Sequence, residues 1–316
     1  PHIHFEYRDS KSVPLNPLTM AFELEDQIMP VARELAVIPL SQNALVNASP
    51  LTQTFPLFRD KSGIYHFPDT ISVFGEFGFA MNVVDKREGT NNVYQFHRAE
   101  LMVDGNLEFE LSYDRIPFNQ GKFAKTMIEY DLKRKNLGEF QKLYRLPEHR
   151  KISIHSSDKS GILGLAPGVH SVEIRIFDAH GNKTIIKGTV AATFPMTLEA
   201  SEIFRDDKVV ILALSPKRGG LAIRDAVVYS FTKYGFADKK VDIIHSEQVK
   251  KGLHITLQLR SVKDRILQII GINQLGGMVY PFHWTDIKPE ISVVDIRPNL
   301  KISNTQRGLF FQVELD

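Results

Sequence analysis

The stretch GILGLAPGVHSVEIRIFDAHGNKTIIKGTVAAT, residues 161–193, predicts the fold more clearly than any other part of the chain. Pro167-Gly168 indicates a corner, and residues 172–176 then alternate between apolar and polar side chains. Such alternation is the pattern of a β-strand with one buried face. His180-Gly181-Asn182 supplies the next turn, because glycine and asparagine accept the backbone conformations that turns require. The stretch therefore predicts a β-hairpin.

This hairpin resembles the last hairpin of immunoglobulin-like and fibronectin type III-like sandwiches in bacterial envelope proteins, where P-G-x-[HY]-x-V-x-[IV] is often followed by D-x-x-G-N. His170 occupies the position at which a tyrosine corner is often found. We interpret His170 as structural, with its imidazole hydrogen-bonded to nearby backbone. Asp178 and Asn182 are candidates for contact with a calcium ion in the turn, although turn-forming side chains need no ion to explain them.

Short alternating segments bounded by turn residues recur along the rest of the chain, as in β-sandwich proteins. A hairpin is predicted at residues 93–116, where Asp104-Gly105 or Gly105-Asn106 forms the turn. Further strands are predicted within residues 31–40, 69–85, 209–216, 226–233, 240–246, 252–260, 265–273, 276–284 and 291–316.

Residues 123–146 fit either a helix or a strand–turn–strand unit. We favour the second, because Thr126, Ile128 and Tyr130 alternate and Asn136-Leu137-Gly138 has the composition of a turn.

The first residues, PHIHFEYRD, place His2 and His4 two positions apart in a predicted strand. Side chains at this spacing project to the same face of a strand, roughly 7 Å apart. The arrangement suits one metal ligand beside one imidazole that handles protons. A polar edge strand with two surface histidines also explains the spacing.

Together with the following KSVPLNPL, this string resembles the closing strand of the lysostaphin-like zinc metallopeptidases, a family of peptidoglycan endopeptidases. Their strand commonly reads G-P-H-L-H-F-E-hydrophobic-R and is followed by a P-x-N-P segment. The matching residues are Pro1, His2, His4, Phe5, Glu6, Arg8, Pro14, Asn16 and Pro17. The resemblance implies that His4 is a zinc ligand and that His2 assists catalysis by polarising or deprotonating the zinc-bound water.

The same resemblance implies two further zinc ligands, from an H-x-x-x-D motif that lies upstream of the closing strand. A catalytic zinc site usually needs three protein ligands and an open position for water. The other histidines form no H-E-x-x-H or H-x-x-x-D pair. We therefore expect zinc only in an intact peptidase domain, and we expect this chain alone to bind zinc weakly and to show no peptidase activity.

These patterns predict an all-β fold of tandem immunoglobulin-like or fibronectin type III-like β-sandwiches after a remnant strand of a peptidase domain. Residues 1–30 are expected to form the end of the peptidase-like domain and a linker. Residues 31–196 are expected to form the first sandwich, 197–286 the second, and 287–316 the start of a further, truncated β segment.

Two hypotheses follow for function. In the first, the chain is the C-terminal accessory region of a bacterial zinc metalloendopeptidase that acts on peptidoglycan peptides, in the periplasm or the outer-membrane-associated cell envelope. Its sandwiches would position the catalytic domain or dock it on envelope protein partners. In the second, the chain is a non-catalytic binding or scaffold subunit with a vestigial peptidase motif. Sandwich folds serve many functions, so the fold alone does not decide between the two.

The composition limits the classes of protein to which the chain can belong. A chain of 316 residues with 43% hydrophobic and 24% charged residues suits two or three globular domains. A net charge of +2 provides no strong field for nucleic acid or an anionic membrane. The chain has no cysteine, which excludes disulfides and thiolate metal sites. No apolar run is long enough for a transmembrane helix, and no signal peptide is visible.

The stretch FPLFRDKSGIYHFPD, residues 55–69, places Phe55, Phe58, Tyr65 and Phe67 among charges and turn formers. It predicts either a loop folded over its own aromatic cluster or a loop that binds a partner. With 21 Phe against 9 Tyr and 1 Trp, the aromatic residues do not favour a sugar-binding platform, which usually uses Trp and Tyr.

Overall fold

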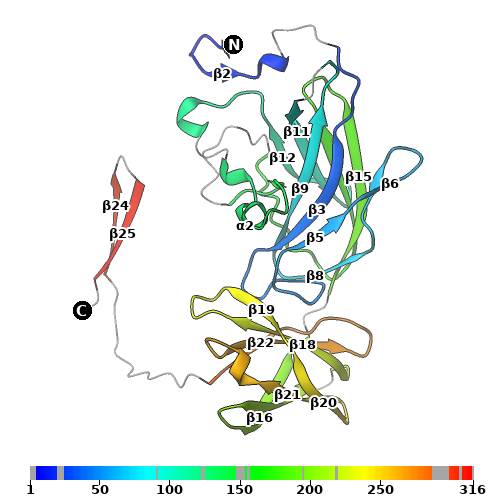
Figure 1. Ribbon diagram of the computed structural model, residues 1–316, viewed down its shortest axis with the longest axis vertical. Helices are drawn as coiled ribbons and strands as arrows, with labels where there is room; N and C mark the ends of the chain where they lie inside the picture. The colour runs from blue at the N-terminus through cyan, green and yellow to red at the C-terminus, as the bar shows by residue number, and fades with distance from the viewer. Residues whose placement is uncertain are drawn as a thin grey trace. The chain divides into compact units, whose positions relative to one another are not determined.

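Strands dominate the computed structural model of the chain (Figure 1). The structure describes residues 5–19, 25–89, 92–121, 125–146, 154, 157–193, 196–217, 220–286, 299–305 and 308–314. The chain divides into two compact units, Pro1–Trp284 and Thr285–Asp316. The prediction of an all-β fold built of β-sandwiches is confirmed.

The first sandwich pairs a five-stranded sheet with an eight-stranded sheet. The smaller sheet contains β3 (Val31–Pro39), β5 (Gln53–Pro56), β9 (Phe77–Lys86), β10 (Val93–Tyr94) and β13 (Gln141–Lys142). Its order is β10-β9-β3-β5, and β13 also pairs with β9. The larger sheet contains β4 (Leu45–Val46), β6 (Phe58–Arg59), β7 (Tyr65–His66), β8 (Ile71–Phe74), β11 (Arg98–Val103), β12 (Asn106–Ser112), β14 (Gly168–Phe177) and β15 (Lys183–Ala192). Its order is β12-β11-β14-β15-β7-β6, while β8 pairs with both β15 and β4.

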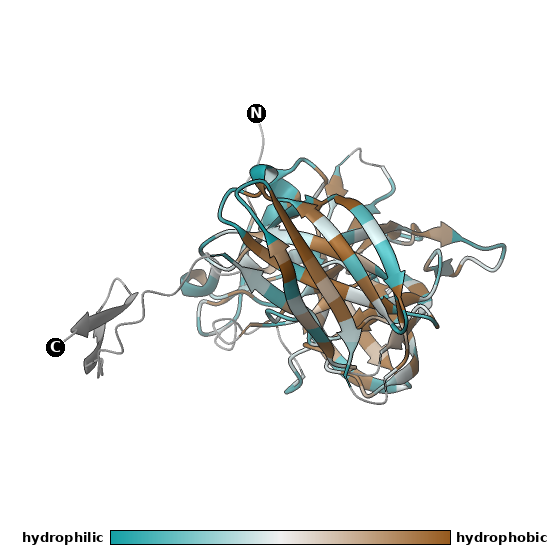
Figure 2. Ribbon diagram, turned by 90° about the horizontal axis from the view of Figure 1, so that it is seen from below, coloured by the Kyte–Doolittle hydropathy of each residue, from teal (hydrophilic) through white to brown (hydrophobic). Residues whose placement is uncertain are grey.

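The predicted hairpins form as expected. β14 and β15 are antiparallel, with Ile174 opposite Ile186. β11 and β12 are joined by Asp104-Gly105, both with positive φ (49° and 77°), as a two-residue hairpin turn requires. The period-two pattern places apolar side chains such as Ile174 inside, and Figure 2 shows this alternation as brown and teal bands along the strands.

The core of the first sandwich lies between its two sheets. Leu35 and Met81 from the smaller sheet and Leu101 and Ile174 from the larger sheet belong to one cluster, and all four are fully buried. Burial of this apolar surface is the main force that holds the sheets together.

The second sandwich consists of two four-stranded sheets. Its strands are β16 (Leu198–Arg205), β17 (Val209–Pro216), β18 (Ile223–Phe231), β19 (Ala237–Val241), β20 (Ile243–Val249), β21 (Gly252–Gln258), β22 (Ile266–Asn273) and β23 (Phe282–Thr285). One sheet has the order β16-β17-β21-β20 and the other has the order β19-β18-β22-β23. With the eight strands lettered A, B, C, C′, D, E, F and G, these orders are A-B-E-D and C′-C-F-G, the immunoglobulin-like arrangement.

A small apolar cluster joins the two sandwiches. Leu45 and Ala48 from the first pack with Ile270 and Met278 from the second. The backbone N–H of Ala48 also donates to the sulfur of Met278 at 2.9 Å.

The prediction of a strand–turn–strand unit at residues 123–146 is wrong in its first half. A 3₁₀ helix (Lys125–Met127) and helix α2 (Tyr130–Arg134) precede the short strand β13. Met127 and Leu132 are buried, whereas Tyr130, one of the alternating residues, is 68% exposed. Packing of residues outside the alternating set therefore decides the local structure.

Two further differences concern strands at sheet edges. β16, which was not predicted, lies at an edge of its sheet and is exposed along most of its length, so it lacks the alternation that marks a half-buried strand. The single strand predicted at residues 240–246 is divided at Asp242 between β19 and β20, which belong to different sheets.

Two short hairpins complete the described chain. β1 (Tyr7–Arg8) pairs with β2 (Pro14–Leu15) and is followed by a 3₁₀ helix (Pro17–Thr19). In the second unit, β24 (Asn299–Thr305) pairs with β25 (Gly308–Glu314). Two other 3₁₀ helices span Phe118–Gln120 and Leu259–Ser261. Among the described residues, no helix has the length and apolar character needed to cross a membrane.

Candidate functional site

The predicted zinc residues His2 and His4 lie outside the described residues. The segment that follows them is hydrogen-bonded to the first sandwich, since the backbone N–H of Asn16 donates to the carbonyl of Asp114 at 2.8 Å. The guanidinium of Arg8 also lies over the ring of Phe118, 4.9 Å from its centroid.

A second attachment joins the chain before β3 to the turn between β14 and β15. Asn182 Nδ2 donates to the backbone oxygen of Asp26 at 2.8 Å, and Thr184 Oγ1 donates to that of Pro30 at 2.5 Å. The turn is itself braced by Asp178, whose Oδ1 accepts from the backbone N–H groups of His180 and Asn182, each at 2.8 Å. The aspartate at the start of the turn thus acts as a turn-forming side chain, as its sequence position indicates.

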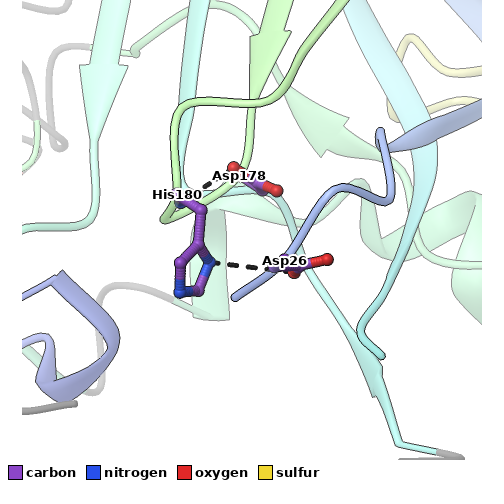
Figure 3. Close-up of side chains that lie close together, drawn as sticks. All are labelled: Asp26, Asp178 and His180. Carbon is purple, nitrogen blue, oxygen red and sulfur yellow. Dashed lines mark hydrogen bonds and ion pairs between the residues drawn. The ribbon is translucent and has the colours of Figure 1, made fainter. Parts of the chain in front are cut away.

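These contacts bring Asp26, Asp178 and His180 together, as Figure 3 shows. Each offers one ligand atom, and these atoms all lie within 4.8 Å of one another. His180 Nδ1 lies 3.7 Å from Asp26 Oδ2, and the Asp26 side chain is only 2% exposed. Carboxylate and imidazole groups at this spacing are the ligand types that divalent metal ions use.

Arg87 contacts the outer nitrogen of His180, with Nη2 and Nε2 3.3 Å apart. A guanidinium only donates hydrogen bonds, so Nε2 accepts in this contact. The ring hydrogen of the neutral imidazole is therefore assigned to Nδ1, on the side of Asp26.

Asp85, near the end of β9, adds a third buried carboxyl group. It is 7% exposed, and its Oδ1 has no hydrogen-bond partner among the described residues. Burial, followed by the charges of Asp178 and Asp26, raises the pKa of Asp85 to about 7. Burial and the two neighbouring carboxylates destabilise the charged form of this carboxyl group.

Asp85 also lines a hollow of about 390 Å³, together with Tyr113, Gln141 and Ala179. Ala179 lies between two members of the cluster, so the hollow and the cluster adjoin. Gln141, another residue of this lining, is 3% exposed.

A hollow on the outer face of the larger sheet has a simpler explanation. It is lined by residues that include Glu173, Arg175 and Lys187. Arg175 Nε lies 2.6 Å from Glu173 Oε1, and Lys187 Nζ lies 3.3 Å from Glu173 Oε2. The first pair lies within β14 and the second joins β14 to β15, and such ion pairs stabilise a solvated sheet face without a ligand.

The aromatic stretch 55–69 forms strands β5 to β7 rather than the expected loop. Phe55 is partly buried against the core, while Tyr65 and Phe67 are buried within it. Phe58 is 53% exposed and stacks on His66 with ring centroids 5.3 Å apart. Of the four residues predicted to bind a partner, Phe58 presents the most exposed ring, and that role stays a prediction.

The structural interpretation of His170 is confirmed. Its Nε2 lies 2.7 Å from the backbone oxygen of Ala166, and its Nδ1 lies 2.7 Å from Asp104 Oδ2. Asp104 was predicted as a turn residue, but its pairing with His170, 66 residues away, has no local sequence pattern.

No family model matches the sequence, and no curated protein matches it. Among solved structures, the chain is similar to a tetra-tandem repeat in the extending region of a large adhesion protein, at 11% identity and a TM-score of 0.20. That match covers 93% of this chain and 82% of the other. A second similar structure comes from a 1.5-MDa bacterial ice-binding adhesin, at 10% identity, a TM-score of 0.18, and coverage of 80% and 85%. At these values neither likeness assigns a function.

Proposed function

We propose that the chain is the accessory region of a cell-envelope zinc metalloendopeptidase, and that it positions the catalytic domain for action on peptidoglycan peptides. The sequence motif around His2 and His4 supports the enzyme class. In this proposal His4 is a zinc ligand and His2 is its proton-handling neighbour. His2 and His4 lie outside the described residues, so their roles rest on the motif. When bound, zinc would polarise the scissile carbonyl and activate water.

The positioning role is supported by one observation: the segment that follows the motif is attached to the first sandwich. Asn16 is hydrogen-bonded to Asp114, and Asp26 is hydrogen-bonded to Asn182. These two partners lie on different parts of the first sandwich. A domain that closes with the strand at residues 1–8 would then be held close to the sandwich, because the connecting chain is fixed at both places.

The proposal is tested first on the coding sequence that precedes residue 1. An H-x-x-x-D motif there supports it, and a peptidase-like sequence without that motif would favour the scaffold hypothesis. The polypeptide that carries the motif is then incubated with purified peptidoglycan, and newly exposed amino groups are measured. His4→Ala is expected to abolish their release, whereas His245→Ala, at an exposed site in the second sandwich, is expected to leave it unchanged. Equal release by both variants would refute the proposal.

A further inference from the structure

Three carboxyl groups, those of Asp26, Asp85 and Asp178, are buried near the turn between β14 and β15. The side chain of Asp26 is 2% exposed, and Asp178 and Asp85 are 2% and 7% exposed. Arg87 is the cation in contact with the group, through His180. Buried carboxylates without a paired charge are costly, and proteins usually neutralise them or bind a cation.

We propose that Asp26, Asp178 and His180, together with Asp85, bind a divalent metal ion that fastens the segment before β3 to the turn between β14 and β15. The site is separate from His2 and His4, and the proposal does not depend on the peptidase hypothesis.

The geometry of the three clustered side chains supports an ion. Their ligand atoms lie within 4.8 Å of one another, so a modest inward movement brings all three to the 2.0–2.6 Å, approximately, at which divalent metals are bound. Asp178 keeps lone pairs for this purpose, because a carboxylate has about four acceptor sites and three are used by the turn.

Asp85 provides the independent observation. Its Oδ1 is buried and has no partner among the described residues. Arg87, two residues further on, reaches His180, and side chains two apart in extended chain share a face. Ala179 and Asp85 line the same hollow. These contacts place the Asp85 carboxyl group beside the 178–182 turn, and in our proposal a metal ion or one of its water ligands satisfies the unpaired oxygen.

The charges also fit a divalent ion. With all three carboxyl groups ionised in the metal-bound state, the guanidinium of Arg87 and the two positive charges of the ion together balance them. Ligation through His180 Nδ1 requires the ring hydrogen to move to Nε2, and Arg87 then turns away from the ring, since two donors cannot face each other. The oxygen-rich set suits Ca²⁺ and Mn²⁺, and the imidazole admits Zn²⁺, so all three ions belong in the test.

The test uses the 1–316 chain after treatment with a chelator. Calcium, manganese and zinc chlorides are titrated separately by calorimetry, and the melting temperature is followed. We expect one ion per chain for at least one metal, and a rise in Tm of about 5 °C at a hundredfold excess over Kd. Asp26→Asn and Asp85→Asn are each expected to weaken binding at least tenfold, since each removes a ligand charge and keeps the side-chain shape.

Asp207→Asn is the matched control, because Asp207 is exposed in the second sandwich. Its Kd is expected to equal that of the unchanged chain. His4→Ala separates the two zinc hypotheses, and zinc binding that is lost in His4→Ala but retained in Asp26→Asn belongs to the motif and overturns the proposal for zinc. Absence of saturable binding for all three metals, or unchanged binding in both folded cluster variants, overturns it entirely.

Discussion

Asn182 and Asp26 are 156 positions apart in the sequence, and the side-chain amide of the first donates a 2.8 Å hydrogen bond to the backbone oxygen of the second. The same amide donates to Asp178 Oδ2 at 2.6 Å. One side chain thus holds the turn between β14 and β15 in shape and attaches the segment before β3 to it.

Asn182→Ala removes both hydrogen bonds and is expected to destabilise the first sandwich by about 1–2 kcal/mol. Hydrogen exchange of the amides at residues 26–29 is expected to accelerate, because their attachment is lost. Asn106→Ala is the control, since Asn106 is exposed at the start of β12 and its amide makes only a 3.4 Å contact. Exchange at residues 26–29 that is equal in the two variants would contradict the attachment.

The contact between the sandwiches gives a second prediction, through Met278. Met278→Ala empties a buried position and leaves the Ala48 N–H without its sulfur acceptor, at an expected cost of about 2–5 kcal/mol. Trp284, the sole tryptophan and part of the second core, reports unfolding of that sandwich by its fluorescence in urea. The midpoint is expected to fall.

Met29→Ala is the control for this substitution. Met29 is 47% exposed, so its truncation is expected to change the stability by less than about 0.5 kcal/mol. If the Trp284 midpoint falls no further in Met278→Ala than in Met29→Ala, the sandwiches do not stabilise each other through this contact.

The parts of the fold that could be predicted from the sequence are those whose signals are local. β17 coincides with the predicted segment 209–216, and the Asp104-Gly105 turn lies between two alternating strands. β16 gave no such signal because its side chains are mostly exposed at an edge. Helix α2 was missed because the burial of Leu132 depends on residues such as Tyr144, which the fold brings to it.

The candidate site also has residues that local sequence patterns predict and residues that they do not. Asp178 and Asn182 were recognised as a turn because they lie within five residues of each other. Asp26 lies in the segment before β3, and Asp85 lies in β9. Only the folding of the chain brings these two residues close to the turn between β14 and β15. A single sequence contains no local pattern that joins them.

The pair formed by His170 and Asp104 predicts a dependence of stability on pH. Both partners of the imidazole, the Asp104 carboxylate and the Ala166 carbonyl, accept hydrogen bonds, so both ring nitrogens must donate and the ring is held as the cation. The hydrogen bond to Asp104, followed by that to Ala166, raises the pKa of His170. The stability that the pair contributes is fully present below the pKa of histidine in the unfolded chain, about 6.5. It is lost as the pH rises through the pKa of His170 in the folded chain.

Asp104→Asn tests this pH dependence while retaining a residue type that tolerates the positive φ of position 104. The variant is expected to melt below the unchanged chain by a margin that is largest near about pH 5.5 and smaller near about pH 9. By nuclear magnetic resonance, His170 is expected to titrate at lower pH in the variant. A margin that does not change with pH, with an unshifted His170 titration, would show that the pair carries no charge-dependent stability.

The position of Phe67 gives the last prediction, because the sequence allowed this ring to face a partner and the structure places it over Gly188. A Cβ built on Gly188 would overlap the Phe67 ring, which is 5% exposed and lies 6.2 Å from the ring of Phe79. Gly188→Ala is therefore expected to destabilise the first sandwich by about 1–3 kcal/mol through overpacking. Gly164→Ala is the matched control, since a Cβ there meets open space.

The double variant Gly188→Ala with Phe67→Leu separates steric overlap from a general effect of alanine in β15. A leucine is smaller than the ring, so the double variant is expected to lose less stability than the sum of the two single losses, with a coupling of about 0.5 kcal/mol or more. Melting followed by near-ultraviolet circular dichroism provides the measurement. If Gly188→Ala melts like Gly164→Ala, the Phe67 ring does not lie on Gly188. The hypothesis that Phe67 faces a binding partner would then be favoured.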